Sequence, residues 1–217
     1  MRLPKDEADS PKIVDFPLPF FYLLNNVTTS NFGRSPSWAV FLGNDFKNMS
    51  RTLDRSEFIK QTNLCLNYIK RECRGSKFYY KPHPNETDEH THFNLEGFEV
   101  IDKEHNEIAE IFFWKNLSDI KYVFSIASTA VWSAYNLGLN AYTFVRPVEA
   151  VIGKDIGSAS DYFNQLPETF FINDYNRPLQ ANRKILTPDP LAERIFLKDI
   201  EAGNNVWLLT GDPGMLP

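Results

Sequence analysis

The chain has few cysteines, no excess of positive charge and no long apolar run. Only Cys65 and Cys73 occur in 217 residues, so neither a disulfide framework nor a zinc site is indicated. The formal net charge of −5 makes a nucleic-acid backbone a poor partner. No stretch of about 18 apolar residues is present, and the first residues lack the apolar core of a signal peptide. We therefore expect a cytoplasmic protein without a transmembrane segment.

The composition that remains is that of a globular protein, with 42% hydrophobic and 24% charged residues. Residues 1–37 differ from the rest because they contain five prolines, which remove backbone donors and restrict the preceding residues. We expect a linker or arm over 1–37 and one domain over 38–217. The apolar patch Phe16–Leu24 offers a surface for a homo-oligomer, because apolar runs this dense are rarely left exposed.

From Trp38 onward, strand-like and helix-like segments alternate. The expected strands are 38–42, 77–80, 98–101, 122–126, 141–145 and 169–172. The expected helices are 56–74, with Ser56 as its N-cap, 107–114, 129–139 and 191–201. Strands that alternate with helices at this spacing predict an α/β fold, a Rossmann-like parallel sheet flanked by helices.

Polar residues follow two of the expected strands. Lys81-Pro82-His83-Pro84 comes after the run 77–80, and a cluster from Ser125 to Thr129 comes after another apolar run. Ligands of open α/β sheets bind at the carboxyl edge, and helix N-termini favour anions. An imidazole held between two prolines can give a proton or positive charge to a phosphate oxygen. The pattern predicts a phosphate site, although a plain turn and a helix cap fit the same residues.

The two motifs together resemble the HP and serine motifs of bacterial sialyltransferases and polysialyltransferases, and more loosely those of CDP-glycerol and capsule-polymer transferases. The resemblance covers roughly residues 38–146. It implies the donor-binding, C-terminal half of a glycosyltransferase-B fold, which binds a CMP-activated sugar without a metal cofactor. The nucleotide-binding residues that it implies are Lys81, His83, Pro84, Glu110, Ser125, Ser128 and Thr129.

The resemblance also assigns roles to these residues. His83 would be the catalytic residue, which stabilises the phosphate or acts as general acid, and Ser128 and Thr129 would be the paired hydroxyls. Glu110 stands where the family has a glutamate for the ribose, but without the family's neighbouring proline. The acidic-acidic-glycine motif that supplies the family's acceptor base does not occur here. We therefore expect a domain that is incomplete without an acceptor domain, with Asp45 as the candidate base.

Three functions remain open at this point. The first is transfer of a CMP-activated sugar to a glycan acceptor of a cell-surface polysaccharide or lipooligosaccharide, which would put the protein in the cytoplasm, with the inner face of a bacterial membrane as one candidate place. The second is a CDP-glycerol-type phosphotransferase. The third is a nucleotide-binding module without catalysis. His90 and His92 resemble a metal loop, but no third ligand follows at a defined spacing, so we expect no metal.

Overall fold

The computed structural model describes residues 13–15, 36–45, 53–87, 89–101, 107–153, 163, 166–183 and 207–209. The chain forms two compact units, one from Gly33 to Lys184 and one from the two terminal segments. In the terminal unit, β1 (Ile13–Asp15) pairs in parallel with β7 (Trp207–Leu209). The expected division at 37/38 stays a prediction. The apolar patch 16–24 and the expected helix 191–201 lie outside the described residues.

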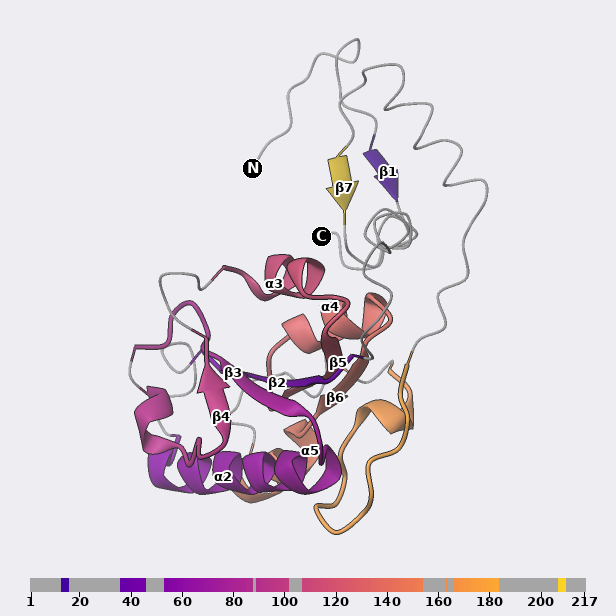
Figure 1. The fold of residues 1–217 in the computed structure, drawn as a ribbon. Helices are drawn as coiled ribbons and strands as arrows, with labels where there is room; N and C mark the ends of the chain where they lie inside the picture. Colours follow the sequence, from indigo (N-terminus) through magenta and orange to yellow (C-terminus); the bar gives the residue numbers. More distant parts are fainter. Residues whose placement is uncertain are drawn as a thin grey trace. The chain divides into compact units, whose positions relative to one another are not determined.

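The larger unit is built on a sheet of five parallel strands (Figure 1). In chain order they are β2 (Trp38–Leu42), β3 (Lys77–Lys81), β4 (Phe98–Val100), β5 (Ile120–Ser125) and β6 (Asn140–Thr143). Across the sheet the order is β4-β3-β2-β5-β6, so the first strand of the unit lies at the centre. This is the strand order of a doubly wound, Rossmann-like sheet. The predicted α/β fold is confirmed.

Helices cover both faces of this sheet, as Figure 1 shows. On one face α2 (Arg55–Glu72) contacts α5 (Val145–Ile152), and on the other α3 (Ala109–Lys115) contacts α4 (Ala130–Asn136). Because both faces are covered, the central strand β2 is apolar throughout and its residues Ala39–Phe41 are fully buried. Among the described residues, no helix is long and apolar enough to cross a membrane.

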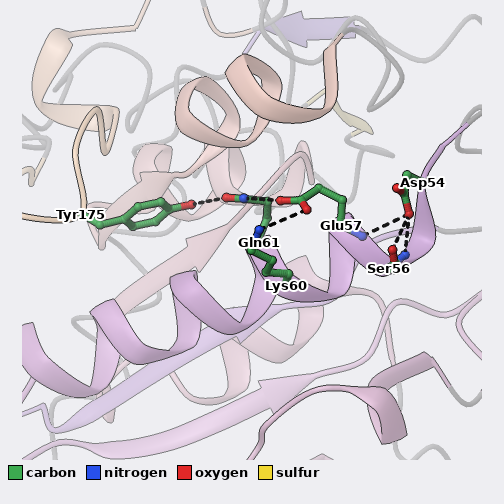
Figure 2. Close-up of polar contacts among 6 residues, drawn as sticks. All are labelled: Asp54, Ser56, Glu57, Lys60, Gln61 and Tyr175. Carbon is green, nitrogen blue, oxygen red and sulfur yellow. Dashed lines mark hydrogen bonds and ion pairs between the residues drawn. The ribbon is translucent and has the colours of Figure 1, made fainter.

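Helix α2 has Asp54 as its N-cap, two residues before the predicted Ser56. The Asp54 carboxylate accepts the backbone N–H of Ser56 at 2.9 Å and of Glu57 at 3.2 Å, as well as the Ser56 hydroxyl at 2.7 Å (Figure 2). The prediction of Ser56 as N-cap is therefore wrong. A carboxylate at the N-cap accepts several donors at once and interacts favourably with the positive end of the helix.

The segment 166–183 has little regular structure and is attached to α2 by side chains. The Tyr175 hydroxyl lies 3.5 Å from Gln61 Oε1, and Gln61 Nε2 donates to Glu57 at 2.8 Å (Figure 2). The strand expected over 169–172 is wrong. A short 3-10 helix, η5 (Glu168–Phe170), occupies its first two residues, and the turn of this helix closes on the carbonyl of Pro167. One bridge joins Phe171 to β6.

Candidate functional site

The carboxyl ends of the three central strands lie level with one another. Leu42 of β2 pairs with Lys81 of β3 on one side and with Ser125 of β5 on the other. Adjacent strands lie about 4.8 Å apart, so the segments that follow β3 and β5 stand about 10 Å apart with the end of β2 between them. The histidine motif (Lys81–Pro84) and the serine motif (Ser125–Thr129) therefore lie at the same edge of the sheet. This edge includes the position where the strand order reverses. Ligands of doubly wound sheets bind at that position.

Hydrogen bonds connect the segment after β2 to both motifs. The buried side chain of Asn44 accepts the N–H of Ala127 through Oδ1 at 3.2 Å, next to Ser128. Asn85 donates from Nδ2 to Oδ2 of Asp45 at 2.8 Å, next to the histidine motif. Sequence reasoning singled out Asp45 but missed both asparagines, because an asparagine after a strand looks like an ordinary turn residue.

His83 lies in the turn that follows β3. Its carbonyl accepts the N–H of Glu86 at 2.9 Å, which closes the turn. Its ring nitrogen Nδ1 accepts the backbone N–H of Asn85 at 3.2 Å, so the neutral ring carries its proton on Nε2. The histidine is half-buried, while Pro84 is exposed. The turn thus presents an imidazole whose Nε2–H is the remaining ring donor.

Glu86 is a buried carboxylate beside the His83 turn, and sequence reasoning missed it as well. It is 2% exposed, and its carboxylate accepts the Tyr80 hydroxyl at 2.9 and 3.0 Å and the His83 N–H at 3.2 Å. Nδ1 of His90 lies 3.1 Å from the other side of the carboxylate. Burial raises the pKa of Glu86, and these partners oppose the shift. A glutamate in a polar loop is usually solvated, so the sequence carries no signal for this burial.

Lys81 is directed into the protein. The residue is 2% exposed, its Nζ donates to the backbone carbonyl of Glu107 at 2.6 Å, and it lies 5.7 Å from the centre of the Phe112 ring. Burial lowers the pKa of Lys81, and the carboxylates of Glu107 and Glu110 oppose this shift. Lys81 therefore holds the segment that leads into α3. Its predicted contact with a nucleotide stays a prediction.

The serine motif occupies the end of β5 and the start of α4. Ser125 is fully buried, and its hydroxyl lies 3.4 Å from the carbonyl of Ser128. Thr129 stands at the N-cap of α4, yet its hydroxyl makes no capping hydrogen bond. Ser128 is half-buried and Thr129 exposed. The interpretation of this cluster as a conventional side-chain cap is therefore wrong for Thr129.

Glu110 lies in the first turn of α3 and reaches α4. Its Oε1 accepts the hydroxyl of Ser133 at 2.9 Å, four residues after Thr129. This contact brings Glu110 beside the helix that starts directly after the serine motif. Its predicted role at a ribose stays a prediction.

No group of three His, Cys, Asp or Glu side chains is arranged to hold a metal ion in the part of the chain that the structure describes. No known family model matches the chain, and no curated protein is significantly similar to it.

Proposed function

We propose that the chain is the donor-binding domain of a glycosyltransferase and binds a CMP-activated sugar at the carboxyl edge of its sheet. The observation that carries the proposal is the register of the three central strands. It puts the turn of His83 and the segment from Ser125 to Thr129 on either side of the end of β2. A fold of this class binds nucleotides at that edge.

The chemistry of the two motifs suits a phosphate leaving group. When the bond between the sugar and CMP breaks, CMP leaves with the bonding electrons and negative charge gathers on its phosphate. His83 can donate a hydrogen bond from Nε2 to that phosphate, because its Nδ1 already accepts the N–H of Asn85. The hydroxyls of Ser128 and Thr129 supply further donors.

Transfer also requires a base that takes the proton of the acceptor hydroxyl as this oxygen attacks the sugar. Asp45 follows the central strand and is joined to the histidine turn through Asn85. Its carboxylate is the candidate for this role within the proposal. The acceptor would be a glycan, as the resemblance to sialyltransferases implies.

A thermal-shift screen with CMP, CDP, UMP, UDP and GDP tests the proposal. A ligand at 100 times its dissociation constant adds about 2.7 kcal/mol to the free energy of unfolding. We expect CMP and CDP to raise Tm. Stabilisation by UDP or GDP alone would contradict the donor assignment, and no response to any of the five would contradict nucleotide binding.

A variant of His83 then tests the site itself. His83→Ala should weaken CMP binding by about 1.5–3 kcal/mol, the usual worth of a hydrogen bond to a charged group, and should leave the fold intact. The matched control is His92→Ala in η2 (Glu89–His92), where the histidine is exposed. Calorimetric titration with CMP gives both affinities. Equal CMP affinities of the two variants and the wild type would show that His83 shapes the turn and does not contribute to CMP binding.

A further inference from the structure

The carboxylate of Glu86 connects three elements beneath the His83 turn. It accepts hydrogen bonds from the hydroxyl of Tyr80 in β3 and from the backbone N–H of His83 in the turn itself. It also contacts the ring of His90 in η2. The side chain of Glu86 is fully buried. A buried carboxylate that accepts several donors holds their positions strongly, because each donor would otherwise lose its partner away from water.

The end of the central strand is packed against the same carboxylate. A Cβ added to Gly43 would lie 2.4 Å from Glu86 Oε2, 2.8 Å from the Tyr80 hydroxyl and 2.9 Å from the His83 nitrogen. Only a residue without a side chain allows this approach. Glu86 therefore fixes the distance between the end of β2 and the His83 turn.

The orientation of the imidazole depends on this turn. The Asn85 N–H that bonds to Nδ1 of His83 lies between His83 and Glu86 in the chain, inside the turn closed by the Glu86 N–H. If the turn changes shape, this N–H moves away from the ring and the reason for the Nε2–H form is lost.

We propose that Glu86 is a positioning residue, which holds the turn so that His83 presents its Nε2–H to the bound ligand. The statement about the ligand rests on the proposed function. The position of the turn depends on the hydrogen bonds of Glu86 with Tyr80 and His83 and on the close packing at Gly43.

NMR of the imidazole nitrogens in the 15N-labelled full chain, without any ligand, tests whether Glu86 holds the turn of His83. The chain has four histidines, and single His→Gln variants assign their signals. The wild type should show His83 mainly as the Nε2–H tautomer. Glu86→Ala should populate both tautomers at His83, Glu86→Gln should restore most of the wild-type signal because one amide oxygen can still accept, and the signals of His92 should stay unchanged.

Titration with CMP measures the consequence for binding. The dissociation constant should rise about tenfold in Glu86→Ala, which corresponds to about 1.4 kcal/mol, and by less in Glu86→Gln. If the wild type binds no nucleotide while Glu86→Ala changes the His83 tautomer, the positioning role stands and the proposed function fails. If Glu86→Ala is folded and keeps both the wild-type tautomer and the wild-type affinity, the positioning role is overturned.

A second pair of variants covers the case in which Glu86→Ala does not fold. Tyr80→Phe removes one donor of the carboxylate and keeps the ring, and Glu86→Gln keeps the shape of the side chain. Tyr80→Phe should shift the tautomer balance of His83, and Glu86→Gln should shift it less because its amide oxygen still accepts. Wild-type His83 signals in a folded Tyr80→Phe variant would overturn the proposal.

Discussion

Replacing Gly43 with alanine should destabilise the protein, because the new methyl group has no room. It would meet a carboxylate oxygen of Glu86 at 2.4 Å, the Tyr80 hydroxyl at 2.8 Å and a backbone nitrogen at 2.9 Å. Both side chains are buried, so neither can move into solvent. Gly43 is not among the glycines with positive φ, so backbone strain does not add to the effect.

The expected loss follows from two contributions. Overpacking a filled interior costs about 1–3 kcal/mol. Pushing Glu86 away also weakens at least one hydrogen bond from Tyr80 or His83, which adds about 1 kcal/mol. We therefore expect the free energy of unfolding to fall by about 2–4 kcal/mol.

Urea unfolding followed by far-UV circular dichroism measures this loss as a lower midpoint at unchanged m. Gly75→Ala is the control, since its Cβ would meet nothing within 4 Å and its φ of +85° gives backbone strain alone. The decisive comparison is Gly43→Ala in the background of Glu86→Ala, where the obstructing carboxylate is gone. The methyl group should cost at least about 1 kcal/mol less there. A loss below about 0.5 kcal/mol in the wild type, or an equal loss in both backgrounds, would refute the steric argument.

Two further predictions concern the thiols and the cap of α2. Burial raises the pKa of Cys65 and of Cys73 to about 12. A thiol reagent at mildly alkaline pH should therefore label neither cysteine in the native protein and both cysteines in urea. Rapid labelling of the native protein would contradict their burial. Hydrogen bonds from Ser56 and Glu57 lower the pKa of Asp54 below its ordinary 3.8, so its stabilising effect is present above that pH and is lost as the pH falls. Asp54→Ala should therefore lower Tm clearly at neutral pH and less in acid, whereas a pH-independent change would show that the charge has no part in the cap.

The sheet could be predicted from the sequence because strands buried on both faces are continuous apolar runs. The run at 38–42 has the same bounds in the structure as in the prediction. The strand expected over 141–145 was predicted less accurately, because β6 ends at Thr143 and α5 begins at Val145. The sequence analysis did not predict α5. Its Pro147 lies in the first turn, where a proline is tolerated because the N–H groups there have no partner within the helix.

The location of the candidate site could be predicted from the sequence. The buried side chains that hold its segments in place could not. Parallel strands have their carboxyl ends at one edge, so the motifs at His83 and Ser125 had to lie near each other once the strand order was known. The burial of Glu86 could not be predicted, because it depends on Gly43 and His90, which reach it from other parts of the fold. The inward direction of Lys81 likewise depends on the loop at Glu107.

The central position of β2 has a consequence for the order of folding. It pairs Trp38 with Lys77 on one side and with the much later Ile120 on the other. Ladders between near segments close first because shorter loops lose less entropy, so β4-β3-β2 and β5-β6 should form as separate halves and join along β2 and β5 last. Unfolding should begin along the same seam. A ligand bound at the carboxyl edge would contact both halves of the sheet. Besides being held for reaction, it would therefore slow the separation of the two halves and with it the unfolding of the protein.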